Sequence, residues 1–326
     1  MHTFGSMRKA GLRLHSLLAR HPRIAEQYFR LLGYWAPKLN AAARSRLLNN
    51  INAVSWPSIR LKANLVAVGK RTKFRLNPHF GEFDSEALVS DQLSYEHEVF
   101  TYLETIIDNY DTIIDIGANV GVYSLFFAIA GDSQRAGTRK VYSFEPSRRA
   151  FHRLLKNLES NHVKNVFPFN CAVGRETGIT EFHEPEGHLT NGSLIGDFAK
   201  IFSSTVSVSP SVVIGGDLVA TLAHDAGQIL LKIDTEGAEA QVLTGLEGFV
   251  RARRPAILME VLDLFVNDLN RLQYLREADY GFFNLTPDGL IQRSKFEASQ
   301  HRDFVLIPNG ANLSSGRLAQ EAVQCA

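Results

Sequence analysis

The sequence predicts an α/β protein whose main domain is a doubly wound, mostly parallel sheet of seven strands. Short β-branched apolar runs, such as residues 112–116 and 228–234, have the pattern of strands buried on both faces. Helical segments alternate with these runs along the chain. This alternation is typical of parallel strands joined by helices, and an antiparallel hairpin is expected to finish the sheet.

One strand–turn–helix–strand unit organises the rest of the chain. It consists of a strand at residues 112–116, a turn between Gly117 and Gly121, a helix at residues 122–130 and a strand at residues 140–144. In a parallel α/β sheet, the first turn of such a unit is the usual place for a nucleotide-like cofactor.

The residues of this turn, DIGANVG, distinguish between cofactors. A dinucleotide site needs three glycines that let the backbone approach a pyrophosphate, whereas this turn has two glycines and begins with Asp115. Asp115 would repel a phosphate but could attract the ammonium group of S-adenosylmethionine (SAM). Glu145, at the tip of the next strand, could accept hydrogen bonds from both ribose hydroxyls. The alternative is an ordinary buried unit in which Asp115 only caps the helix.

A second set of ionisable groups follows the strand at residues 228–234. The segment reads KIDTEGAE and contains Lys232, Asp234, Glu236 and Glu239. Strand alternation places Lys232 and Asp234 on the same side of the sheet. Neighbouring carboxylates raise one another's pKa, which makes one of them a candidate general base. Acids that complement the dipole of a following helix would explain Glu236 and Glu239, but not Lys232 and Asp234.

The other elements expected along the main domain are less regular. We expect a helix over residues 94–108, a loop-rich segment over residues 174–216, and a long helix from about residue 264 to 279. The remaining expected elements are a helix at 148–160, a strand at 166–173, a helix at 240–250, a strand at 256–261 that ends near Glu260, and closing strands at 281–285 and 303–308.

The composition is that of an ordinary soluble globular chain, but its charge is unevenly distributed. The 326 residues have a net charge of +1, whereas residues 1–60 contain ten Lys/Arg and one Asp/Glu. The rest of the chain is therefore net acidic, which argues against a nucleic-acid partner for the main domain. The two cysteines, Cys171 and Cys325, indicate no disulfide framework, and a cytoplasmic location is expected.

The sequence before the main domain predicts two small parts. Residues 1–55 form a basic helical extension and residues 56–93 a small β extension, ahead of the main domain at 94–308 and a flexible tail at 309–326. Basic amphipathic helices can make peripheral contact with a membrane or bind another anionic partner. A helical cap with a solvated basic face is the alternative, and the sequence favours it.

Four segments together resemble the FkbM-type SAM-dependent methyltransferases: DIGANVG, SFEP, NCAVG, and LKIDTEGAEAQVLTGL followed by RPAILMEV. The resemblance covers about residues 94–308. DIGANVG alone is typical of any class I methyltransferase, whereas the K-x-D-x-E-G-x-E segment makes the resemblance specific. The resemblance implies the class I methyltransferase fold with SAM as the cofactor. It also implies an acceptor hydroxyl on a sugar, a lipid-linked glycan or a related natural product.

The resemblance also implies roles for individual residues. The methionine part of SAM would be held by the first turn, through Asp115, Gly117, Asn119 and Gly121. Glu145 would bind the ribose hydroxyls, and Asn170 and Ala172 would flank the adenine.

For catalysis, we expect Asp234 and Glu236 to position the acceptor or remove its proton, with Lys232 as their partner. A divalent cation bound by Asp234, Glu236 and Glu260 is an alternative way to activate the hydroxyl, although no sequence spacing demands it. A class I enzyme that methylates nitrogen would read Asp/Asn-Pro-Pro-aromatic where this chain reads Asp-Thr-Glu-Gly, which favours oxygen. A non-catalytic SAM-binding scaffold and a nicotinamide-dependent oxidoreductase are the competing functions.

Overall fold

The computed structural model describes residues 11–187 and 191–310. It divides the chain into two compact units, an N-terminal unit (Met1–His97) and a C-terminal unit (Glu98–Ala326), which are described separately. The first residues of the expected N-terminal helix and nearly all of the expected tail lie outside the described residues. No helix within the described ranges has the length and apolar character needed to cross a membrane.

The N-terminal unit contains the expected helices followed by a small β hairpin. Residues 11–18 are helical, and the further elements are α2 (Pro22–Trp35), the 3-10 helix η1 (Ala36–Lys38), α3 (Ala41–Asn52), β1 (Asn64–Val68), β2 (Thr72–Leu76) and the 3-10 helix η2 (Phe83–Leu88). Pro22 stands at the first position of α2, where its missing N–H costs nothing. Ala25, Phe29 and Leu32 of α2 pack into the apolar core of this unit.

The C-terminal unit is built on one large sheet with the order β12-β11-β13-β10-β9-β3-β4-β5. The strands are β3 (Thr112–Ile116), β4 (Lys140–Phe144), β5 (Val166–Phe169), β9 (Ile229–Ile233), β10 (Ala256–Glu260), β11 (Tyr280–Thr286), β12 (Gly289–Arg293) and β13 (Asp303–Pro308). The five strands from β10 to β5 are parallel, and the other three join them antiparallel. This confirms the doubly wound, mostly parallel sheet, but with eight strands rather than seven, because β12 was not predicted.

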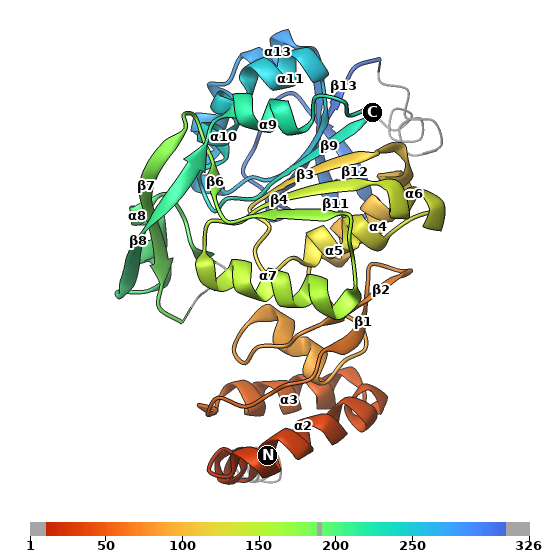
Figure 1. Cartoon of the computed structure of the whole chain (residues 1–326), viewed down its shortest axis with the longest axis vertical. Helices are drawn as coiled ribbons and strands as arrows, with labels where there is room; N and C mark the ends of the chain where they lie inside the picture. The colour runs from red at the N-terminus through yellow and green to blue at the C-terminus, as the bar shows by residue number, and fades with distance from the viewer. Residues whose placement is uncertain (1–10, 188–190, 311–326) are drawn as a thin grey trace. The chain divides into compact units, whose positions relative to one another are not determined.

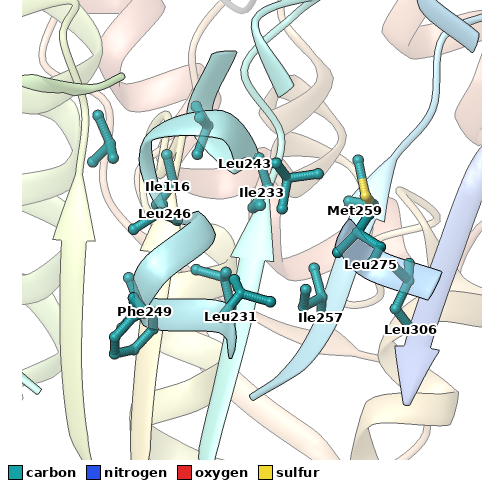
Figure 2. Packing of buried hydrophobic residues seen from close by; sticks show 14 of the residues in the cluster. Ile116, Leu231, Ile233, Leu243, Leu246, Phe249, Ile257, Met259, Leu275 and Leu306 are labelled. Carbon is teal, nitrogen blue, oxygen red and sulfur yellow. The ribbon is translucent and has the colours of Figure 1, made fainter. Parts of the chain in front are cut away.

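Helices cover both faces of this sheet (Figure 1). They are α4 (His97–Ile106), η3 (Ile107–Asn109), α5 (Val122–Ile129), α6 (Ser133–Thr138), α7 (Arg148–Asn161), α9 (Gly216–Leu222), α10 (Glu239–Gly245), α11 (Glu247–Arg253), η5 (Asp263–Phe265), α12 (Val266–Asn270) and α13 (Tyr274–Glu277). On one face, Leu243 of α10 and Leu246 and Phe249 of the following segment pack against strand side chains that include Leu231 and Ile233 (Figure 2). On the other face, α5 packs against β3, β4 and β5.

The expectation of a loop-rich segment at residues 174–216 is wrong. This segment contains β7 (Gly178–Pro185), α8 (Gly196–Phe202) and β8 (Val206–Ile214), and the two strands form a small sheet with β6 (Ala172–Val173). The predicted strand at 166–173 is therefore two strands in two sheets. Most of β8 is solvent-exposed, so its sequence does not carry the apolar pattern of a buried strand.

The long helix expected at residues 264–279 is also wrong, because this segment is broken into η5, α12 and α13. Asn270 explains one of the breaks. Its side-chain amide donates to Phe296 O at 2.9 Å and its amide oxygen accepts from Phe296 N at 3.1 Å. Asparagine readily leaves a helical conformation for such contacts. The helix expected at 240–250 is likewise divided into α10 and α11 at Leu246.

The order in which strands are added to the sheet reverses between the parallel neighbours β3 and β9. From β3 the chain moves to β4 on one side, whereas from β9 it moves to β10 on the other. In open α/β sheets, ligands bind outside the carboxyl ends of the strands at such a switch point. The two strand ends lie so close that a Cβ on Gly117 would stand 1.6 Å from Asp234 O, and Gly117 has a φ of +80°. Only glycine fits this position.

We therefore expect Gly117→Ala to lower the free energy of unfolding by at least about 3 kcal/mol, because backbone strain and overpacking add at one position. Chemical denaturation of the purified chain measures this loss. Gly248→Ala is the matched control, since it lies in α11, has nothing within 4 Å of its added Cβ, and replaces glycine by a better helix former. Equal stability of the two variants would contradict the close approach of β3 and β9.

Candidate cofactor and active site

The turn after β3 is held by backbone hydrogen bonds to the end of β4. Gly117 N and Ala118 N both donate to Phe144 O, at 2.9 and 3.0 Å, and Gly121 N donates to Ala118 O at 2.9 Å. Gly117, Asn119 and Gly121 all have positive φ angles. The turn therefore curls back over the sheet edge and brings the Asn119 backbone to the carboxylate at the tip of β4.

That carboxylate is Glu145, which is buried at the sheet edge. Asn119 N donates to its Oε2 and Ser147 N to its Oε1, both at 2.7 Å. Burial raises the pKa of Glu145 to about 7, although these two hydrogen bonds and the Lys232 charge oppose the rise. Each carboxylate oxygen can accept a second hydrogen bond, so Glu145 retains the capacity to accept from two hydroxyl groups.

Three residues predicted to contact other parts of SAM lie in different environments: Asn119 for the methionine part, and Asn170 and Ala172 for the adenine. Asn170 is next to it in space, and its side-chain amide donates to Glu145 O at 2.8 Å. Asn119 Oδ1 is buried and has no hydrogen-bond partner among the described residues, so it is an acceptor that a ligand ammonium could use. Ala172 is buried in β6, and its contact with an adenine stays a prediction.

Asp115 lies deeper than the turn it begins. Its side chain is 0% exposed, accepts a hydrogen bond from Ser124 Oγ at 2.7 Å, and lies 3.7 Å from Lys232 Nζ. Burial raises the pKa of Asp115, and the Lys232 charge lowers it. The chain thus supplies the cation that pairs with Asp115. A direct contact of Asp115 with a cofactor ammonium stays a prediction, because the ligand would have to share this carboxylate with Lys232.

Lys232 joins the cofactor turn to the acidic segment. It is almost fully buried on β9, and its Nζ donates to Gly117 O at 3.2 Å and to Asp234 Oδ2 at 3.0 Å. The ammonium also lies over the Tyr123 ring of α5, 4.6 Å from the ring centroid. Ile233, between Lys232 and Asp234, belongs to the apolar cluster on the opposite face, as strand alternation predicts.

Glu239 holds the loop between β9 and α10. Its Oε1 accepts hydrogen bonds from Thr235 N, Thr235 Oγ1 and Gly237 N at 2.9–3.1 Å. Glu236 has a φ of 55° and Gly237 a φ of 101°, so the loop turns sharply at two successive residues. Ser193, in the segment between β7 and α8, donates from its Oγ to Glu236 O at 2.7 Å. Glu239 therefore shapes the loop, and Glu236 is the carboxylate that the loop presents.

The three remaining acids converge at the ends of β9 and β10. Carboxylate oxygens of Asp234, Glu236 and Glu260 all lie within 4.8 Å of one another. Burial, followed by the charges of Asp234 and Glu260, raises the pKa of Glu236 to about 9. Arg302 lies 3.6 Å from Glu260 and partly balances this charge. Such a set of carboxylate oxygens suits a hard divalent cation such as Mg²⁺ or Mn²⁺.

Sequence reasoning missed several contributors to the site: Tyr123, Ser124, Ser143 and Ser193. Ser124 Oγ lies 2.8 Å from Ser143 Oγ and 2.7 Å from Asp115. The contribution of Ser124 could have been inferred from the sequence, because it is a serine inside the otherwise apolar run VYSLFFAIA. Ser193 carried no such signal, because it comes from a segment expected to be loop.

The chain belongs to the FkbM methyltransferase family, a family of SAM-dependent methyltransferases. The family model described as "Methyltransferase FkbM domain" matches residues 115–282, which is more than half of the chain. The match begins at Asp115 and includes both parts of the site described above. SAM is the cofactor of this family, and the capacity of Glu145 for hydroxyl donors and the free acceptor on Asn119 fit it.

Individual relatives are more distant. "Methyltransferase 1" of Beauveria bassiana is 28% identical over 149 residues, which cover 41% of this chain and 58% of that protein. The solved structure of methyltransferase FkbM from Methylobacillus flagellatus covers 61% of this chain and 43% of its own, with 14% identity and a TM-score of 0.37. A SAM-dependent O-methyltransferase from Thermotoga maritima covers 72% and 73%, with 11% identity and a TM-score of 0.37. Similarities of this size say nothing about the acceptor.

Binding of SAM or S-adenosylhomocysteine is expected to strengthen as pH rises to the Glu145 pKa of about 7 and to level off above it. Below that pH the buried carboxyl of Glu145 is protonated, whereas the ribose hydroxyls donate to its ionised form. Binding must then release this proton, so the affinity should change by up to about tenfold per pH unit. Calorimetric titration across this range measures the slope.

Glu145→Gln is the control for this experiment, because it keeps the shape and removes the titration. Its affinity should be weaker above the pKa and independent of pH. An unchanged pH slope in Glu145→Gln would assign the titration to another group and contradict the ribose role.

Proposed function

We propose that this chain is a SAM-dependent O-methyltransferase that transfers a methyl group to a hydroxyl of a glycan, a lipid-linked sugar or a related natural product. One observation carries the proposal: the cofactor turn and the acidic segment meet at the same switch point and are joined by Lys232. A SAM-binding scaffold would need the turn and Glu145, but not the second set of groups. Membership of the methyltransferase family argues against the nicotinamide-dependent alternative.

The work left to the protein is alignment and proton removal, because bound SAM supplies an already activated methyl group. Holding two reactants in line contributes roughly 7–11 kcal/mol in well-oriented reactions. Removal of the hydroxyl proton by a positioned base contributes about 10²- to 10⁴-fold. The residues for both tasks lie on adjacent strand ends, so a single rigid edge can supply them.

Asp234 is our candidate for the base. Its side chain is 22% exposed, so an acceptor hydroxyl can reach it. Lys232 Nζ donates a hydrogen bond to Asp234 Oδ2 at 3.0 Å, which fixes the position of the carboxylate. Glu236, whose pKa is raised to about 9, is protonated at neutral pH without a cation and can instead donate a hydrogen bond to the acceptor.

Asp234→Asn is expected to lower turnover by about 10²- to 10⁴-fold, because it removes the base, while the amide oxygen can still accept the hydrogen bond from Lys232. Transfer of labelled methyl from SAM, with an acceptor found by screening wild-type protein on glycans and lipid-linked sugars, measures turnover. Calorimetry should show S-adenosylhomocysteine affinity close to wild type. Asp225→Asn, at a highly exposed acid, is the control. Full turnover by Asp234→Asn would remove Asp234 from the active site.

We also propose that Asp234, Glu236 and Glu260 can hold a divalent cation, which would lower the pKa of the acceptor hydroxyl. The supporting observation is the convergence of their oxygens within 4.8 Å. The cation is an alternative to the base assignment, because Asp234 serves in both, and chelation and Glu260→Gln are the tests that distinguish them.

Chelation with EDTA is expected to lower methyl transfer by roughly a hundredfold, and added Mg²⁺ or Mn²⁺ should restore it. Calorimetry with Mn²⁺ should detect one site in wild type that weakens strongly in Glu260→Gln. Glu277→Gln removes an exposed carboxylate on α13 and should bind Mn²⁺ as wild type does. Full activity in EDTA together with no Mn²⁺ binding would refute the cation site.

A further inference from the structure

Helix α2 of the N-terminal unit is apolar on two sides. Ala25, Phe29 and Leu32 face the core of the unit. Ile24, Leu31 and Tyr34 are 54%, 61% and 68% exposed. Residues seven apart lie on the same side of a helix and residues three apart are neighbours, so these three side chains form a second apolar stripe. A helix that only caps its own core needs one apolar face, and an exposed second one marks an interaction surface.

The surroundings of this stripe are strongly basic. Residues 11–76 contain thirteen Lys/Arg and a single acid, Glu26. The Glu26 carboxylate accepts a hydrogen bond from Arg60 N at 2.8 Å. Arg23 and Arg30 lie seven residues apart on α2 and are both exposed beside the stripe. The surface therefore combines apolar side chains with positive charge, as interfacial helices do.

A small pocket lies next to the stripe and shares Tyr34 with it. Its volume is about 120 Å³, and cations from three segments line it: Arg30 of α2, Lys62 before β1 and Arg75 of β2. Leu65 of β1, which is also exposed, lines the same pocket. No acidic residue occurs among its lining residues, all of which lie in the described part of the chain. The pocket therefore favours a compact anionic group such as a phosphate.

We propose that the N-terminal unit docks on an anionic phospholipid membrane. The headgroup phosphate occupies the pocket of Arg30, Lys62 and Arg75, and the stripe of Ile24, Leu31 and Tyr34 enters the boundary between headgroups and acyl chains. Nucleic acid would also satisfy the cations, but its phosphates give Ile24 and Leu31 no apolar partner. Tyrosine at the edge of such a stripe suits the membrane interface, where its ring is buried and its hydroxyl is hydrated. This proposal does not depend on the proposed enzymatic function.

Vesicle sedimentation with the full chain tests the charged part of the surface. We expect binding to vesicles of phosphatidylcholine with phosphatidylglycerol, little binding to phosphatidylcholine alone, and weakening with salt. The triple variant Arg30→Gln/Lys62→Gln/Arg75→Gln should bind roughly 100- to 200-fold more weakly, since each basic residue near the surface adds about 1 kcal/mol. Lys140→Gln/Lys164→Gln/Lys295→Gln removes the same charge from exposed sites of the C-terminal unit and should bind as wild type does.

A second variant distinguishes binding to a membrane from binding to other anionic partners. Leu31→Ser/Tyr34→Ser keeps every cation, and we expect it to bind the same vesicles at least about tenfold more weakly. The substituted positions are exposed, so the triple variant of Arg30, Lys62 and Arg75 and the double variant of Leu31 and Tyr34 should both fold. Thermal unfolding curves like that of wild type would show this. Equal weakening by the two triple variants, unchanged vesicle binding by Leu31→Ser/Tyr34→Ser, or tighter binding of duplex DNA than of vesicles would each overturn the proposal.

Discussion

The buried ammonium of Lys232 is the interaction on which the candidate active site depends. It contacts the carbonyl of Gly117 in the cofactor turn and the carboxylates of Asp115 and Asp234 on adjacent strand ends. Removing one partner from a buried set of charges typically costs about 3–5 kcal/mol, whereas replacing the whole set by apolar residues can be neutral. We infer that the main role of this set of charges is to position the acidic segment relative to the cofactor turn, rather than to stabilise the fold.

The central sheet could be predicted because its parallel strands are buried on both faces. Continuous β-branched runs such as those of β3 and β9 are compatible with few structures other than a buried strand. The strands β7 and β8 belong to a small sheet with one solvated side, where Ile179, Val208 and Val212 are exposed. The sequence of β8, VSVSPSVVI, does alternate as a strand does, but Pro210 interrupts the alternation and most of the strand is exposed, so the prediction missed it.

The sequence was enough to predict which strand ends form the site, because the carboxyl ends of parallel strands meet at one edge of the sheet. Residue type alone could not show whether a carboxylate faces a ligand or the chain itself. Asp115 pairs with Lys232 inside the fold, and Glu239 accepts three bonds from its own loop. Ser193 reaches the site through tertiary contact alone, which a local sequence pattern does not encode.

The charge distribution assigns different electrostatic tasks to the two units. Residues 1–97 contain fifteen Lys/Arg and six Asp/Glu, so the net charge of +1 for the whole chain requires a net acidic C-terminal unit. Screening limits charge interactions to about 8 Å at physiological salt, so an anionic surface responds to the nearest patch and not to the net charge. Such a surface attracts the patch of Arg30, Lys62 and Arg75 on the N-terminal unit. Docking of the N-terminal unit would therefore hold the chain at a lipid surface through this basic patch, whatever the net charge of the whole chain.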